Sequence, residues 1–89
     1  MKIKEGYLLR QVAGSNIIVA VGEEAVNFDG IKTLNETGAF LWKQLEQEAT
    51  EKDVIKALME EYEVDAETAR TDVQEFVKLL IYNGLIDNE

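Results

Sequence analysis

The stretch Gly30-Ile-Lys-Thr-Leu-Asn-Glu-Thr-Gly-Ala-Phe-Leu-Trp42 decides the fold, because it joins the end of an expected strand to the start of an expected helix. Asn35 is placed to cap that helix, since its side-chain oxygen can accept a backbone N–H of the first turn. Gly38 follows one turn later, where a missing side chain lets another backbone come close, although glycine costs a helix about 1 kcal/mol relative to alanine. An apolar stripe at helical spacing continues the helix. It consists of Leu34, Leu41, Trp42 and Leu45.

The residues before this stretch predict a β-hairpin and a further strand. Residues 7–12 are apolar with polar interruptions, residues 13–16 form a turn cluster, and residues 17–21 are rich in β-branched side chains. The third strand falls in residues 25–28, in residues 31–34, or in both across a bulge. The sequence therefore predicts three short strands.

Three helices are expected after residue 34. The first runs from about Asn35 to Gln47. Thr50-Glu-Lys-Asp53 resembles a capping box, with aspartate in place of the usual Glu or Gln, and opens the second helix. Asp65 caps the third helix, and Asn83-Gly84 ends it because glycine readily takes the left-handed conformation. Leu85-Ile86 is expected to fold back onto the core.

Strands followed by helices are typical of an α+β fold, here a three-stranded antiparallel sheet followed by three helices. The length of 89 residues predicts a single domain over residues 1–89, and the hydrophobic share of 46% is too high for a disordered chain. The N-terminus lacks a signal-peptide pattern, and the longest apolar run, residues 17–21, is far shorter than the ~20 residues of a membrane helix. We therefore expect a cytoplasmic protein with no membrane partner.

The usual chemical motifs are absent from the sequence. With neither His nor Cys, the chain has no imidazole base, no thiolate nucleophile and no zinc site of the common kind. It has no glycine-rich phosphate-binding motif. Carboxylate pairs such as Glu23-Glu24 and Glu60-Glu61 lack the spacing of an EF-hand loop and are interpreted as solvated surface charge. The sequence predicts no enzyme, no metal and no cofactor; a small enzyme or metal protein is the third hypothesis.

The second and third helices resemble a helix-turn-helix, and a preceding hairpin makes it a winged helix-turn-helix. A DNA-recognition helix must present side chains that bind phosphates and bases. The third helix instead carries three acidic residues against two basic ones, in a chain of net charge −9. These charges argue against nucleic acid as a partner. An acidic winged-helix module that binds another protein or DNA in regulation is the alternative function.

The third helix and the unpaired edge of the sheet form a candidate binding surface. Helical spacing places an inward face along the helix, consisting of Ala69, Val73, Phe76, Val77 and Leu80. Leu79 lies on one flank beside Asp72, and Ile81 lies on the other. A three-stranded sheet leaves an edge to which a peptide strand can be added. The sequence leaves open which flank borders the third strand, and whether these residues are ordinary core periphery.

The chain resembles the PqqD-like peptide chaperones, small winged helix-turn-helix domains also called RiPP recognition elements. The resemblance covers nearly the whole chain in the expected order, and Leu34 to Trp42 is its most specific part. The matching segments are Tyr7-x-Leu9-Arg10, Val12-Ala13-Gly14, Leu34-Asn-Glu-Thr-Gly-Ala-Phe-x-Trp42, Tyr62, Asp72-Val-x-x-Phe76, Leu80 and Gly84-Leu-Ile86.

The resemblance implies a non-catalytic peptide chaperone. Such domains bind the leader region of a ribosomally made precursor peptide and present it to a modifying enzyme, often a radical S-adenosylmethionine (radical SAM) protein. The leader is expected to add a strand beside the third strand, in a groove against the third helix. No feature of the chain ties it to pyrroloquinoline quinone or to any other product.

Two sets of residues are the expected peptide contacts. The set on the strand side is Val26, Asn27, Phe28 and Ile31. The set on the third helix is Asp72, Val73, Phe76 and Leu79. Asp72 or Glu75 is expected to meet a basic leader residue. The family markers Leu34, Asn35, Gly38 and Trp42 are assigned to the structure and not to the binding site.

Overall fold

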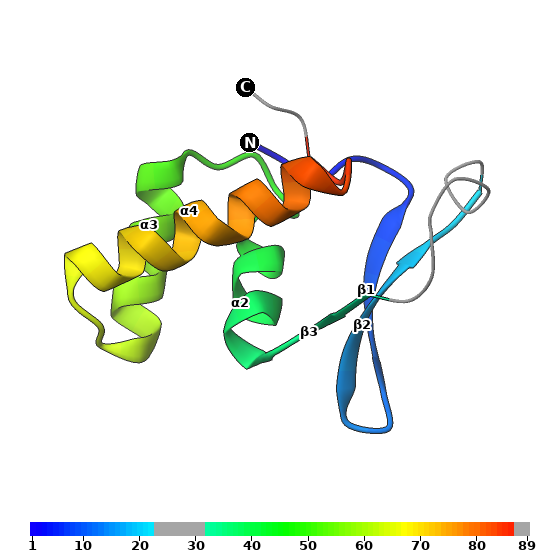
Figure 1. Ribbon diagram of the computed structural model, residues 1–89, viewed down its shortest axis with the longest axis horizontal. Coiled ribbons are helices and arrows are strands. Elements are labelled where there is room, and N and C mark those ends of the chain that lie inside the picture. The colour runs from blue at the N-terminus through cyan, green and yellow to red at the C-terminus, as the bar shows by residue number, and fades with distance from the viewer. Residues whose placement is uncertain (23–31, 87–89) are drawn as a thin grey trace.

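The computed structural model describes residues 1–22 and 32–86, and within them a sheet precedes a set of helices (Figure 1). The strands are β1 (Tyr7–Val12), β2 (Ser15–Ala20) and β3 (Lys32–Leu34). The helices are α2 (Glu36–Gln44), α3 (Glu51–Tyr62) and α4 (Ala66–Tyr82). The expected α+β fold, with strands followed by helices, is confirmed.

The sheet is antiparallel in the order β1-β2-β3. β1 pairs with β2 along its whole length, and the reversal between them places Ala13 and Gly14 in left-handed conformation, with φ of 52° and 82°. β2 begins at Ser15, two residues before the expected start. β3 pairs with the first half of β2, from Asn16 opposite Leu34 to Ile18 opposite Lys32. Of the two positions predicted for the third strand, residues 31–34 contain β3, and residues 25–28 lie outside the described residues.

Asn35 caps α2 as predicted, since its Oδ1 accepts the backbone N–H of Gly38 at 2.7 Å. The helix ends at Gln44, three residues before the expected end at Gln47. The reason is a long-range contact: the carbonyl of Leu45 accepts the backbone N–H of Ile3 at 2.9 Å. The side chain of Leu45 is fully buried, so this turn also adds to the core.

The caps of α3 and α4 confirm the sequence prediction. Asp53 donates its backbone N–H to Thr50 Oγ1 at 3.1 Å, and Thr50 donates its own N–H to the Asp53 carboxylate at 3.2 Å, which completes the capping box. Asp65 accepts the N–H of Thr68 at 2.8 Å at the start of α4. Beyond the end of α4, Gly84 has a φ of 73°.

The core lies between the helices and one face of the sheet. It contains Trp42 and Leu45 together with Ile18 and residues from both ends of the described chain. Ile3 and Ile86 form an isolated antiparallel bridge, and both are buried, so the predicted return of Leu85-Ile86 onto the core is confirmed. Trp42 is completely buried, and its Nε1–H has no hydrogen-bond partner among the described residues.

The structure corrects the expectation that Gly38 lies close to the backbone of another element. A Cβ at this position would lie 3.1 Å from Asn35 Oδ1 and 3.5 Å from Phe76 Cε1. The close neighbours are therefore side chains and not the backbone of another element. The glycine leaves room both for the cap of its own helix and for an aromatic ring of α4.

Candidate functional site

The edge of β3 that faces away from β2 has no strand partner among residues 1–22 and 32–86. An edge strand carries backbone N–H and C=O groups that can pair with an added strand. The C-terminal end of α4 is the part of this helix nearest the sheet (Figure 1), and residues of α4 and β3 line one pocket. The edge and the helix together form a candidate binding site.

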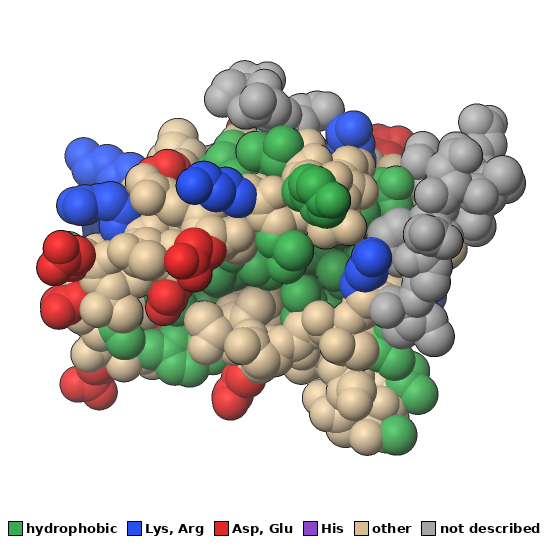
Figure 2. Space-filling model, in the orientation of Figure 1, with side chains coloured by type: hydrophobic (Ala, Val, Ile, Leu, Met, Phe, Trp, Pro, Cys, Tyr) green, Lys and Arg blue, Asp and Glu red, His purple; other side chains and the backbone are tan. Residues whose placement is uncertain are grey.

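An apolar groove of about 420 Å³ runs between β3 and the second half of α4. Lys32, Thr33 and Leu34 line it on the strand side, and Ile18 and Leu85 are also part of its lining. On the helix side, its lining includes Leu79 and Tyr82, which are 49% and 89% exposed. Figure 2 shows hydrophobic side chains gathered on this face of the molecule. Large apolar side chains left exposed beside a free strand edge are suited to an apolar ligand.

A second hollow of about 330 Å³, here called the acidic hollow, lies between the start of α2 and the middle of α4. Asn35 and Thr37 line it from α2 and its cap, and Asp72 and Glu75 line it from α4. Leu79 lines both the acidic hollow and the apolar groove, so the two are neighbours along α4. A ligand that follows the helix would meet apolar and acidic surface in succession.

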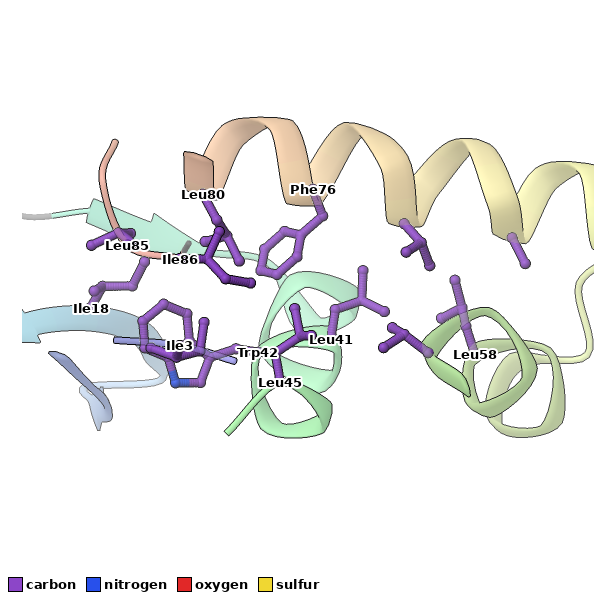
Figure 3. Packing of buried hydrophobic residues seen from close by; sticks show 13 residues of the cluster. Ile3, Ile18, Leu41, Trp42, Leu45, Leu58, Phe76, Leu80, Leu85 and Ile86 are labelled. Carbon is purple, nitrogen blue, oxygen red and sulfur yellow. The ribbon is translucent and has the colours of Figure 1, made fainter. Parts of the chain in front are cut away.

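The structure places the predicted α4 residues at different depths. Asp72, Phe76 and Leu79 line the acidic hollow. Val73 is 1% exposed and belongs to the core, so it does not reach the surface of the site. Phe76 is mostly buried, and Figure 3 shows its ring pointing from α4 into the interior. Helical spacing placed Val73 and Phe76 on the inward face of α4 and Leu79 on its flank, and the burial of these side chains agrees with that placement.

The structure settles which flank of α4 borders the sheet. Leu79 and Asn83 line the groove beside β3, whereas Ile81 packs against the core. On the strand side, the four predicted contacts lie outside the described residues. They are Val26, Asn27, Phe28 and Ile31.

Of the residues that line the apolar groove, the sequence prediction named only Leu79 as a peptide contact, and Lys32 and Tyr82 are among those that it missed. Each had a local signal. Tyr82 stands three positions after Leu79, a spacing that places two side chains next to each other on a helix. Lys32 stands two positions before Leu34 in a strand, so both side chains point to the same face. The missing information was the position of α4 against β3.

The described residues offer binding groups, and they hold no group of three or more His, Cys, Asp or Glu side chains placed to bind a metal ion. None of the described helices is long and apolar enough to cross a membrane.

Comparisons with known proteins agree with this geometry. The family model described as coenzyme PQQ synthesis protein D (PqqD) matches residues 23–86. The structure of TbiB1 in complex with the TbiA(beta) leader peptide is similar with a TM-score of 0.79 and 20% sequence identity, covering 100% of this chain and 98% of that chain. A lasso peptide synthetase B1 complexed with the leader peptide is similar with a TM-score of 0.73 and 24% identity, covering 94% of this chain and 93% of that chain. The comparison with curated proteins gives no match.

Proposed function

The chain belongs to the PqqD family, and from this premise we propose that it is a peptide chaperone for the leader region of a ribosomally synthesised precursor peptide. The observation that carries the proposal is the edge of β3, which has no strand partner among the described residues and lies beside the apolar groove. Further support comes from the two similar structures, both of which are complexes with leader peptides. The bound leader is presented to an enzyme that modifies the rest of the precursor.

The proposed mode of binding is strand addition. Backbone groups of the leader pair with the free edge of β3, and alternate leader side chains enter the apolar groove against Leu79 and Tyr82. Because the groove is mainly apolar, we expect aliphatic or aromatic leader residues at these positions. The contacts predicted at Val26, Asn27, Phe28 and Ile31 remain part of this proposal.

The acidic hollow adds a polar contact to the proposal. Asp72 and Glu75 both line the hollow, and none of its described lining residues is a lysine or arginine. A basic leader residue placed there would gain a charge-assisted contact. Such a contact is partly exposed to solvent, so it favours the correct register of the peptide more than it adds affinity.

The chaperone itself is proposed to be non-catalytic. The sequence has no His or Cys, and the site presents aliphatic, aromatic and carboxylate groups suited to binding. The chemistry then belongs to the modifying enzyme, for which a radical SAM protein is one candidate class. A cytoplasmic location is part of the proposal, because a precursor peptide is available to such an enzyme where it is made.

A titration followed by NMR tests the proposed function. The ¹⁵N-labelled chain is titrated with the synthetic leader of the precursor peptide encoded beside its gene. We expect amide shifts in β3 and in the second half of α4, with α3 little affected. A short DNA duplex serves as the control. Because acidic residues outnumber basic ones on α4, we expect no saturable amide shifts with the duplex at moderate salt. Leader shifts absent from both β3 and α4 would contradict the proposal.

A further inference from the structure

The proposed leader site carries opposite charges at its two ends. Asp72 and Glu75 line the acidic hollow at one end. Lys32 lines the apolar groove at the other end, and it is the only charged residue in the described lining of this groove. In Figure 2, acidic side chains border the hydrophobic surface on its left and a basic side chain borders it on its right, near the strands. A ligand that fills the site therefore meets a negative end, an apolar middle and a positive end.

The side chain of Lys32 lies on the groove side of the sheet. Lys32 stands opposite Ile18 in the register of β2 and β3, and residues opposite each other share a face. Because Ile18 is buried in the core, the lysine stem lies along apolar surface while its ammonium group reaches toward solvent. Lys32 is half-buried and has no ion-pair partner among the described residues. Its charge is therefore available to an anionic group of a ligand.

The carboxylates at the other end are available to a cation. Asp72 is half-buried and Glu75 is exposed. Neither of them forms an ion pair within the part of the chain that the structure describes. A peptide with a basic residue at this end and an acidic residue at the Lys32 end would match both charges, whereas the reverse order would bring like charges together twice.

The order of these charges is fixed relative to the direction of β3. The strand begins at Lys32, and Asn35, which follows its last residue, lines the acidic hollow. The positive end of the site thus lies at the start of β3 and the negative end lies just beyond its end. Antiparallel pairing is slightly more stable per residue than parallel pairing. A leader antiparallel to β3 passes the acidic hollow first and Lys32 second.

The length of α4 between the two ends sets the spacing of the charges on the leader. Glu75 and Tyr82 are seven positions apart, and Asp72 and Asn83 are eleven positions apart. At 1.5 Å per residue of helix, these separations are about 10 to 16 Å. An extended strand covers that distance with about three to five residues.

We propose that this chain selects leaders in which a lysine or arginine is followed, about three to five residues later, by an aspartate or glutamate, with apolar residues between them. The basic residue lies in the acidic hollow, and the acidic residue lies beside Lys32. This inference rests on the proposed function and adds to it the direction of the bound leader and the order of its charges.

Charge exchange tests the order of the charges. The probe is the synthetic leader of the precursor peptide encoded beside the gene, and calorimetric titration measures its Kd. Asp72→Lys and Lys32→Glu should each weaken binding about fivefold or more, because each brings like charges together. Changing the basic residue of the leader to glutamate should restore the affinity of Asp72→Lys, and changing its acidic residue to lysine should restore that of Lys32→Glu. The crossed combinations should bind more weakly than either change alone.

Lys52→Glu is the matched control for Lys32→Glu, because it makes the same charge change at an exposed position of α3. It should keep the wild-type affinity for the leader within about twofold. Restored affinity in the exchanged pairs also shows that the variants are folded.

A nitroxide label at the N-terminal side of the bound leader segment tests the direction without a change of charge. The label should broaden the amide signals of residues 35–37 more than those of Lys32 and Asn83. Broadening in the opposite order, a leader that lacks the two charges, or exchanges that restore no affinity overturn the inference. A dimer in sedimentation that Lys32→Glu dissociates overturns it in favour of a second copy as the occupant of the site. If the wild-type chain binds no leader, the proposed function fails and this inference with it, whereas binding that is indifferent to the charges overturns this inference alone.

Discussion

The strand-to-helix junction, Leu34 to Trp42, and the groove side of α4 differ in burial and in what they do. In the junction, Leu41 and Trp42 are 2% and 0% exposed. On the groove side of α4, Leu79 and Tyr82 are largely exposed. Two of the family markers, Gly38 and Trp42, are thus buried, whereas Leu34 lines the groove and Asn35 lines the acidic hollow. The most exposed groove residues, Leu79 and Tyr82, carry a weak sequence signal. The most specific family signature in this chain belongs mainly to its fold, and the exposed surface of α4 beside it is the part proposed to contact the ligand.

Replacing Trp42 by alanine gives the largest expected effect and tests the structural half of this comparison. Removing a fully buried tryptophan leaves a cavity and should lower the free energy of unfolding by about 3–5 kcal/mol, measured by urea denaturation. Trp42→Phe should cost less, because it leaves a smaller cavity and removes the unpartnered Nε1–H. The folded fraction of each variant should bind the leader with the wild-type Kd. A clearly weaker Kd in the folded protein would place Trp42 in the binding site.

Replacing Leu79 by serine tests the role of the groove side of α4, and we expect an effect of intermediate size. The side chain is exposed at the meeting point of the apolar groove and the acidic hollow, so its loss should weaken leader binding about tenfold, or about 1.4 kcal/mol. The free energy of unfolding should change by less than about 0.5 kcal/mol. Calorimetric titration with the leader measures the first quantity and urea denaturation the second.

Val12→Ser is the control for Leu79→Ser, because it removes an exposed apolar side chain from the opposite face of the sheet. It should leave the Kd of the leader unchanged. Equal losses of leader affinity in both variants would show that the groove side of α4 has no special role.

The smallest expected effect comes from acid and concerns only the helix caps. The backbone N–H of Thr50, and then its side chain, hold the pKa of Asp53 below its ordinary value of 3.8. Hydrogen bonds from Thr68 likewise lower the pKa of Asp65 from 3.8. A carboxyl group whose pKa is lower in the folded state stabilises the fold at any pH above its pKa in the unfolded state. This stabilisation is lost as the pH falls through the pKa of the folded state. Stability should therefore be level from pH 7 to about 5 and fall below about pH 4.

Asp65→Asn provides the control for this pH dependence. Asparagine is as good an N-cap as aspartate but does not titrate. Near neutral pH the variant should have the same thermal midpoint of unfolding as the wild-type chain. In acid its thermal midpoint should fall by less than that of the wild type. An acid transition identical to that of the wild type would remove Asp65 from this explanation.

The caps and the order of elements could be predicted because each depends on a few adjacent residues. Asn35, Asp53 and Asp65 all bond within three residues of their own position. The end of α2 could not be predicted, since it depends on the contact of Leu45 with Ile3. Helical spacing placed Val73 on the inward face of the third helix, and the structure buries it there. The place of Tyr82 beside the groove could not be predicted, because it depends on how α4 lies against β3, which no local pattern contains.

The bridge between Ile3 and Ile86 brings positions near the start and near the end of the chain together in space. A polypeptide with this geometry can be inserted into a surface loop of a host protein, because its two connections to the host lie next to each other. The same proximity permits circular permutation, with new ends opened at the exposed reversal of Ala13 and Gly14. A gene fusion made at these two positions would carry the intervening fold, with its proposed binding surface, into a larger protein without a change in the order of its elements.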